Sequence, residues 1–412
     1  MKRFVAILIL LLPIVVQGAT INAASGSRAD VNTAIASASA GDTVVVPADT
    51  ESWSGGVTIS GITLQGPGKD HASPCIVTAG LVTVTKHASQ NTRLIGFRFT
   101  GTDQHLSVDG SASTFYVIRD NHFNVPGGTW GAVSANGGLF VSNTIIATTA
   151  TSADVFAINL GTSAGATTWL AAQTMGTNDA TGLNNIYFEN NVFSNILETA
   201  FDADNGARIV CRYNTFYDSS LVMHAGGSGT SENDTSLVGH RHVEVYKNTF
   251  DRVSNAFALN KWCWWRGGSG VFISNVLEDA SSPDGSSYPN KSEVQLGVGC
   301  ESSGYPIRYQ IGQTTDTADA TPDAPLLIYS NTGAGSSSGN FIDLRGNDTG
   351  GGGHTCGDPE TYIQSGRDYA TSNTWNWQAY TYPHPLAGDE GGGGGGGNGN
   401  RSATVSGTFR AY

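Results

Sequence analysis

Short runs of alternating apolar and polar residues recur along the chain, each followed by an asparagine and an apolar residue. In chain order they read "FYVIRDNHF" (115–123), "LFVSNTI" (139–145), "IYFENNVF" (186–193), "IVCRYNTF" (209–216), "VEVYKNTF" (243–250), "VFISNVL" (271–277) and "LLIYSNT" (326–332). Alternation with a period of two, bounded by Gly, Asn, Asp and Ser, predicts short β-strands.

The asparagines set the register of this repeat, and they lie at positions 121, 143, 191, 214, 248, 275 and 331. The intervals fit a period of about 22–27 residues, with two intervals doubled and one lengthened by a loop. One such unit cannot bury its apolar side chains alone, whereas stacked units share a core. The repeat therefore predicts an all-β solenoid.

Asparagine has a physical role at the corner of such a coil. It tolerates the left-handed backbone conformation that a sharp turn needs. Asparagines in consecutive coils can also hydrogen-bond to one another in a ladder. We therefore interpret "NTF" (214–216 and 248–250) as a corner followed by an inward-facing aromatic residue.

The segment "SRADVNTAIASASAGDTVVVP" (27–47) predicts a short helix before the first strands. Asp30 is a plausible N-cap, and Gly41 is expected to stop the helix. Four apolar residues share one helical face: Val31, Ala34, Ile35 and Ala38. We expect this helix to cover the end of the stack, where unpaired strand edges would favour aggregation.

The stretch "DVNTAIASASAGDTVVVPADTESW…GVTISGITLQGPG", the coils "RYNTF" and "YKNTF", and the closing "YTYPHPL" (380–386) resemble proteins of the pectate-lyase-like superfamily, in particular exported bacterial or phage-associated members. The resemblance covers roughly residues 20–388. It implies a right-handed parallel β-helix. The superfamily includes lyases, hydrolases, epimerases, adhesins and tailspikes, so the resemblance alone does not choose an activity.

The first eighteen residues predict export. Lys2 and Arg3 precede an apolar stretch, Phe4–Val16, and Val16–Gly18 suits signal peptidase. We therefore expect a secreted, extracellular protein without a membrane span in its mature form. The net charge of −13 argues against nucleic acid as a partner.

Five cysteines in an exported chain permit one or two disulfides, and the sequence does not pair them: Cys75, Cys211, Cys263, Cys300 and Cys356. The predicted organisation is a signal peptide at 1–18, the β-helix at 19–388, a polyglycine linker at 389–400 and a strand-like tail at 401–412.

Basic and aromatic residues gather between positions 241 and 266, against the acidic balance of the whole chain. Indole rings stack on sugar rings, and guanidinium groups bind carboxylates. The candidate substrate-binding residues are Asn260, Lys261, Trp262, Trp264 and Trp265. Alternation along this stretch predicts that one or two of the tryptophans point into the core.

Counting from the corner asparagines places Asp202, His224 and Asn260 near one another on adjacent coils. The candidate catalytic residues on this flank are Asp202, His224, Arg241, Glu244 and Arg266. A lyase would use a base such as His224 and neutralise a uronate with Arg or Ca²⁺. A hydrolase would use two carboxylates. Glu198, Asp202 and Asp204 are the candidate Ca²⁺ ligands.

Two functions of different classes follow. The first is a polysaccharide-directed protein that binds, and as a lyase or hydrolase cleaves, a glycan on the flank formed by residues 198–266. The alternative is a non-catalytic structural, adhesin or tailspike-like protein that self-assembles through its C-terminal tail, "ATVSGTFRAY".

Overall fold

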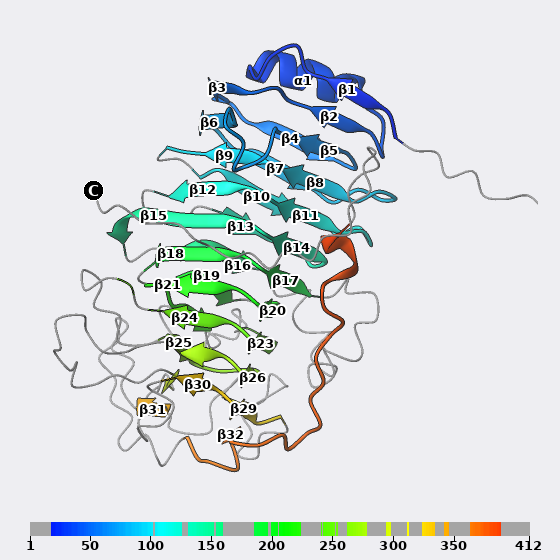
Figure 1. The fold of residues 1–412 in the computed structure, drawn as a ribbon. Helices are drawn as coiled ribbons and strands as arrows, with labels where there is room; N and C mark the ends of the chain where they lie inside the picture. The colour runs from blue at the N-terminus through cyan, green and yellow to red at the C-terminus, as the bar shows by residue number, and fades with distance from the viewer. Residues whose placement is uncertain are drawn as a thin grey trace, which may run out of the picture.

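The structure is a computed structural model, and the parts of the chain that it describes are residues 18–101, 104–125, 131–151, 154–159, 185–196, 199–204, 206–223, 240, 242–251, 253, 262–277, 294–297, 311–312, 324–333, 342–345 and 363–388. Three all-parallel sheets wind around one core (Figure 1), which confirms the predicted right-handed parallel β-helix. Within these ranges no helix is long and apolar enough to cross a membrane.

The three sheets are called A, B and C here. Sheet A contains β1 (Thr20–Asn22), β2 (Thr43–Val45), β5 (Thr63–Gln65), β8 (Thr92–Ile95), β11 (Tyr116–Arg119), β14 (Gly138–Val141), β17 (Ile186–Glu189), β20 (Arg208–Arg212), β23 (His242–Tyr246), β26 (Ser269–Ile273), β29 (Leu326–Tyr329) and β32 (Tyr369–Ala370). Sheet B contains β3 (Asp49–Ser52), β6 (Cys75–Ala79), β9 (Phe97–Phe99), β12 (His122–Val125), β15 (Thr144–Thr151), β18 (Val192–Ile196), β21 (Thr215–Tyr217), β24 (Thr249–Asp251), β27 (Val276–Leu277) and β30 (Thr332–Gly333). Sheet C contains β4 (Val57–Ser60), β7 (Val82–Thr85), β10 (Leu106–Asp109), β13 (Gly131–Val133), β16 (Asp154–Asn159), β19 (Thr199–Asp204), β22 (Leu221–Met223), β25 (Cys263–Trp265), β28 (Val294–Gly297) and β31 (Ile342–Arg345).

The strands of sheets A, B and C follow one another along the chain, and one such set makes a coil. Each strand then pairs in parallel with the equivalent strand of the next coil, as β8 does with β11 and β11 with β14. The alternating sequence pattern explains the burial. In β4, Val57 and Ile59 are buried in the core, whereas Thr58 and Ser60 are exposed.

The predicted N-terminal helix is α1 (Arg28–Ser37), and it covers the first coils at one end of the stack (Figure 1). Val31 and Ala34 are buried against the core, as expected from the helical face. The predicted cap was wrong: Ser27 is the N-cap, and its hydroxyl accepts a hydrogen bond from the Asp30 amide. The helix ends at Ser37, and Gly41 lies in the turn that follows.

The repeated asparagines form one hydrogen-bonded ladder at the corner between sheets A and B. Each side-chain amide donates to the side-chain oxygen of the next asparagine, at distances of 3.0 to 3.3 Å. Each side-chain oxygen also accepts from the preceding ladder residue's backbone N–H, as Asn214 does from Asn191 at 2.9 Å. The predicted ladder is confirmed for all seven asparagines, from Asn121 to Asn331.

The sequence interpretation assigned the left-handed backbone conformation at these corners to the ladder asparagine, and this was wrong. The conformation belongs to the residue immediately before the asparagine, with φ between 54° and 58° in every case: Asp120, Ser142, Asn190, Tyr213, Lys247, Ser274 and Ser330. The physical reason is that the preceding residue makes the sharp turn. The asparagine that follows can then direct its side chain inward, along the stack.

Aromatic rings follow the ladder into the core. Phe193, Phe216 and Phe250 come two residues after their ladder asparagines, and all three are fully buried. The first pair stacks with ring centroids 4.9 Å apart and the second pair with centroids 4.7 Å apart. The interpretation of "NTF" as a corner followed by an inward-facing aromatic residue is therefore confirmed.

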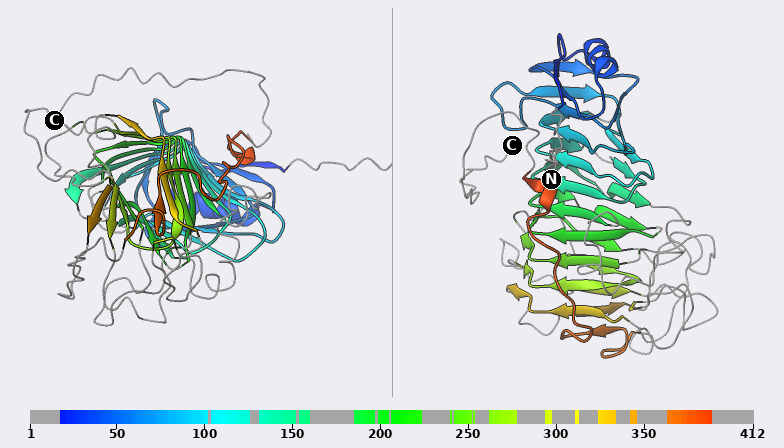
Figure 2. Two further views of the ribbon diagram at one scale, coloured as in Figure 1. Left: turned by 90° about the horizontal axis from the view of Figure 1, so that it is seen from below. Right: turned by 90° about the vertical axis from the view of Figure 1, so that its right-hand side faces the viewer.

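After β32 the chain turns back along the stack as an extended segment, residues 371–388, called the strap here. It runs over the outer face of sheet A to a short 3₁₀ turn, η2 (Pro385–Ala387), beside β14 (Figures 1 and 2). A second apolar cluster lies between sheet A and the strap, and it includes Tyr187, Val210, Tyr246 and Tyr380. Outward-facing residues of sheet A are therefore buried over several coils.

Candidate functional site

The candidate site on the flank 198–266 is only partly within the described residues. Five of its predicted members lie outside them: Glu198, His224, Arg241, Asn260 and Lys261. Their roles stay predictions. The other members fall on two different sheets, C and A, and are therefore not all brought together.

The outer face of sheet C holds four of the predicted residues. Asp202 and Asp204 lie on β19, and Trp264 lies on β25 with Arg266 directly after it. All four are partly exposed, whereas the intervening Ala203 is fully buried. Alternation along a strand therefore directs this acidic pair and this Trp–Arg pair to the same outer surface.

The strand register relates the two pairs. Asp202 lies opposite Val222 on β22, and Val222 lies opposite Trp264. The expected nearness of Asp202 to His224 stays a prediction, because His224 lies outside the described residues. The turns after the corner differ in length between coils, so counting from the asparagine does not give the register of sheet C.

Trp264 and Arg266 form one contact pair. The guanidinium carbon of Arg266 is 4.8 Å from the centroid of the Trp264 ring. The indole lies over the next strand at Gly297, where an added Cβ would come within 2.6 Å of the indole nitrogen. Glycine at this position thus leaves room for the ring to lie along the sheet, with one side of the ring towards the guanidinium.

Three residues that the sequence analysis did not select extend this surface. Gln295 lies opposite Trp264, Asp343 lies opposite Gln295, and Arg345 lies opposite Gly297. Gln295 is buried, whereas Asp343 is partly exposed. The sequence signal was the alternation in "EVQLG" (293–297) and "IDLR" (342–345), but without the register it could not connect these strands to Trp264.

The other two candidate tryptophans are core residues. Trp265 is 0 % exposed and Trp262 is 5 % exposed, and both belong to the central hydrophobic cluster. This agrees with the expectation that one or two of the tryptophans point inward. Their rings are packed by neighbouring side chains, so the assignment of Trp262 and Trp265 to substrate stacking is not supported by their position.

Glu244 lies away from this surface, on β23 of sheet A. It is fully buried beside His242, with 3.4 Å between the nearest carboxylate oxygen and His242 Nε2. Burial lowers the pKa of His242, and Glu244 opposes the effect. Trp375 of the strap packs edge-on against His242, with centroids 5.9 Å apart. The structure therefore does not bring Glu244 together with Asp202 and Arg266.

The described residues contain no group of three or more His, Cys, Asp or Glu side chains that could hold a metal ion. Asp202 and Asp204 offer carboxylate oxygens on one face of β19, but Ca²⁺ takes six to eight oxygen ligands. The predicted third ligand, Glu198, lies outside the described residues. The Ca²⁺ site stays a prediction.

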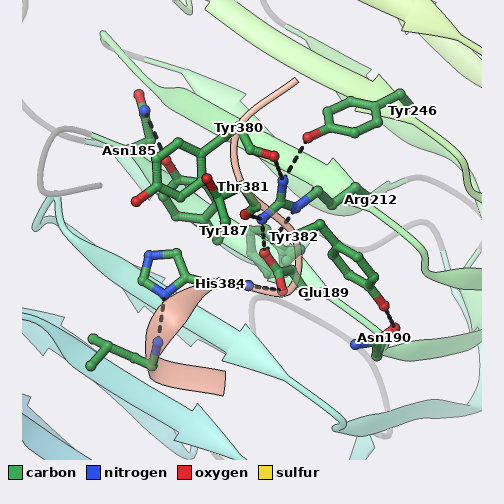
Figure 3. Close-up of polar contacts among 12 residues, drawn as sticks. Asn185, Tyr187, Glu189, Asn190, Arg212, Tyr246, Tyr380, Thr381, Tyr382 and His384 are labelled. Atoms are coloured by element: carbon green, nitrogen blue, oxygen red, sulfur yellow. Dashed lines mark hydrogen bonds and ion pairs between the residues drawn. The ribbon is translucent and has the colours of Figure 1, made fainter. Parts of the chain in front are cut away.

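A second polar site, which the sequence analysis missed, is centred on Arg212 beneath the strap (Figure 3). Arg212 is fully buried and forms an ion pair with Glu189 on the neighbouring strand, with Nε 2.8 Å from Oε1. Its remaining N–H groups donate to the Tyr246 hydroxyl at 2.8 Å and to the backbone carbonyls of Tyr380 and Thr381 at 2.6 and 2.7 Å.

Glu189 binds the strap as well. Its second oxygen accepts a hydrogen bond of 3.0 Å from the backbone N–H of His384 (Figure 3). Burial, with a further contribution from the charge of Arg212, lowers the pKa of His384 to about 4. At neutral pH this site therefore holds a neutral imidazole beside a charged, fully hydrogen-bonded ion pair.

A sequence signal for this second site does exist. Glu189, Arg212 and Tyr246 each precede a ladder asparagine by two residues. The ladder fixes the register at this point, so these three side chains must be neighbours on consecutive strands. The strap partners of Arg212 and Glu189 lie 168 to 195 residues further along the chain, and no repeat relates the two segments.

The chain was also compared with known proteins. No protein-family model matches the sequence, and no curated protein matches it. The parallel β-helix is therefore established by the structure alone, and no relative assigns an activity to either polar site.

Proposed function

We propose that the protein binds a polysaccharide along the outer face of sheet C. The observation that carries this proposal is the partly exposed Trp264 ring with the Arg266 guanidinium 4.8 Å from its centroid. Sugar rings stack on indole, and a guanidinium donates paired hydrogen bonds to hydroxyl or carboxylate oxygens. The Trp264–Arg266 pair offers both kinds of contact.

The length of this surface supports a polymer as the ligand. Asp202, Val222, Trp264, Gln295 and Asp343 occupy one register row across five consecutive strands. At a strand spacing of about 4.8 Å, the row extends roughly 19 Å from β19 to β31. Three of these residues are partly exposed, with the acidic Asp202 and Asp343 at the two ends and the Trp264 ring at the centre, whereas Val222 and Gln295 are buried between them. A small monosaccharide would contact only part of the row.

Hydrolysis is the second candidate function, and the acidic pair on β19 favours it. Asp202 and Asp204 are two residues apart on the same face, which separates their Cα atoms by about 6.6 Å. Carboxyl groups about 5 to 9.5 Å apart serve as the acid and the base or nucleophile of glycosidases. One would protonate the glycosidic oxygen while the other activated water or attacked the sugar. β-Elimination would instead need a base such as His224 or Arg241.

The same proposal includes an extracellular location and membership of the pectate-lyase-like superfamily. The leader-like residues 1–18 and the opening coils support these two points. The alternative of self-assembly through residues 401–412 rests on a segment outside the described residues. The self-assembly alternative predicts no ligand on sheet C, so an experiment can distinguish it from glycan binding.

Binding to an array of plant, bacterial and animal polysaccharides tests the proposal. We expect the wild-type protein to bind at least one glycan, and Trp264→Ala to weaken that binding at least tenfold. Thr83→Ala is the matched control, because Thr83 also lies on sheet C but belongs to β7, several coils away. Equal binding by wild type and Trp264→Ala would refute the proposed surface, and no binding to any glycan would favour self-assembly.

Hydrolysis is tested on the bound glycan by measuring reducing ends. We expect Asp202→Asn and Asp204→Asn to lower the rate by at least a hundredfold while binding is retained. New absorbance near 235 nm would instead identify a lyase. Binding without either product would leave a carbohydrate-binding protein.

A further inference from the structure

The strap is attached to sheet A by side chains and not by strand pairing. Within residues 371–388 the regular element is the three-residue turn η2, and these residues join none of the three sheets. Instead, sheet A holds the strap backbone through two side chains. Arg212 donates to the carbonyls of Tyr380 and Thr381, and Glu189 accepts from the N–H of His384.

Aromatic side chains of the strap add to these two anchors. The ring of Tyr382 stacks on Tyr213 with centroids 3.5 Å apart, and its hydroxyl donates to the Asn190 side chain at 2.8 Å. Trp377 packs edge-on against Tyr246 with centroids 5.0 Å apart. These contacts hold an extended peptide through its backbone polar groups and its aromatic side chains. None of them depends on a covalent link to the same chain.

The fit between the strap and sheet A is incomplete at two places, one around His242 and one at His384, which packs against Phe115 and Tyr187. Apart from the His242 Nε2–Glu244 Oε1 contact, four buried polar atoms of this interface have no hydrogen-bond partner in the described part of the chain, two on sheet A and two on the strap: His242 Nδ1, Glu244 Oε2, Trp377 Nε1 and His384 Nε2. Buried polar atoms are normally paired, and leaving them unpaired is destabilising. These atoms lower the free energy needed to open the interface, whereas the coils beneath it keep their full ladders.

The strap also has a natural hinge. The first four residues of the strap, "TSNT" (371–374), connect β32 to the rest of the strap, and all four are exposed. Rotation there would release the strap without breaking a strand pairing or disturbing the core. Exchange of an identical terminal segment between two copies needs these two features, an exposed hinge and a docking site already present in each copy.

From these contacts we infer that the outer face of sheet A, around Glu189, Arg212 and Tyr246, is a peptide-docking site whose occupant is exchangeable, and that the strap of a second copy of this chain can occupy it. Reciprocal exchange gives a closed dimer, because each copy donates one strap and accepts one. This interaction is independent of glycan binding on sheet C.

A nicked full-length chain tests the inference. A protease site replaces the exposed "TSNT" hinge, and cleavage leaves the strap held by its contacts alone. We expect the cleaved strap to remain bound, and a fluorescent peptide of residues 371–388 to replace it. A control peptide carrying Tyr382→Ala should bind at least tenfold more weakly, because it lacks the stacking on Tyr213. Loss of the strap without peptide binding, or a strap that never exchanges, would overturn the inference.

The second copy is tested with the Arg212→Met chain, which offers an intact strap but has lost the main anchor of its own site. Mixed with the nicked chain in the absence of free peptide, it should give a heterodimer by light scattering. Two separate monomers, in a mixture where the labelled peptide does bind, would refute the dimer and leave a peptide site used only within one chain.

Discussion

The asparagine ladder predicts a large difference between two otherwise identical substitutions, Asn214→Ala and Asn331→Ala. Asn214 lies inside the ladder and is 1 % exposed, and its side chain takes part in bonds to Asn191, Asn248 and the Phe188 carbonyl. Its removal leaves the buried Asn191 N–H without an acceptor. Asn331 is the last ladder residue and is only partly buried.

The magnitudes follow from these contacts. An unpaired buried N–H costs about 1–3 kcal/mol, and each lost side-chain hydrogen bond about 1 kcal/mol. Asn214→Ala removes three such bonds and leaves one N–H unpaired, so it should lower the free energy of unfolding by about 4–6 kcal/mol. At Asn331, water can replace the lost partners, so we expect about 1 kcal/mol.

Urea denaturation of both variants, followed by tryptophan fluorescence, measures the difference. A gap of about 3–5 kcal/mol between the two variants supports the ladder as a buried, cooperative element. Equal losses for Asn214→Ala and Asn331→Ala, or a loss below about 1 kcal/mol at Asn214, would refute the reasoning.

Two further predictions concern titration and thiol reactivity. The pKa of His384 falls from 6.5 to about 4 in the folded protein, so the unfolded chain gains a proton first as the pH drops and stability decreases between pH 6.5 and 4. From pH 7 to 5 the part of the loss due to His384 should be about 2 kcal/mol by urea denaturation. The total loss should be smaller by this amount in His384→Asn, which keeps an acceptor for the Leu386 N–H and leaves the contribution of His242 in place; an equal loss in that variant would contradict the assignment. The side chains of Cys75, Cys211 and Cys263 are fully buried, so an alkylating reagent should modify them only after denaturation, as measured by peptide mass spectrometry. Their rapid labelling in the native protein would show that the core is not closed.

The repeat predicted most of the fold because one residue type marks the same corner in every coil. All seven asparagines from 121 to 331 take their expected places in the ladder. Two local errors have simple causes. Ser27 caps the helix three residues before Asp30, since either residue type can accept from the first free N–H groups. At each corner, the preceding residue takes the left-handed conformation.

The candidate site on sheet C was harder to predict, because it depends on the strand register of sheet C and the asparagine ladder fixes the register only at the corner between sheets A and B. The turns between sheets B and C vary in length, so Asp202 lies opposite Val222, and Glu244 belongs to a different sheet. The sheet residues of the Arg212 site, in contrast, could be predicted from the ladder. They share one offset from the ladder, whereas their strap partners at 380–384 follow no repeat.

The central claim is that a glycan lies over Trp264, and residue-resolved oxidation of the tryptophans tests it most directly. Trp264 is partly exposed on sheet C, whereas Trp375 and Trp377 are partly exposed on the strap, away from the proposed ligand. In the presence of a saturating glycan, chosen from the array, oxidation of Trp264 should fall at least fivefold while that of Trp375 and Trp377 is unchanged. If the glycan is bound and Trp264 oxidises at its original rate, the outer face of sheet C is not the binding surface.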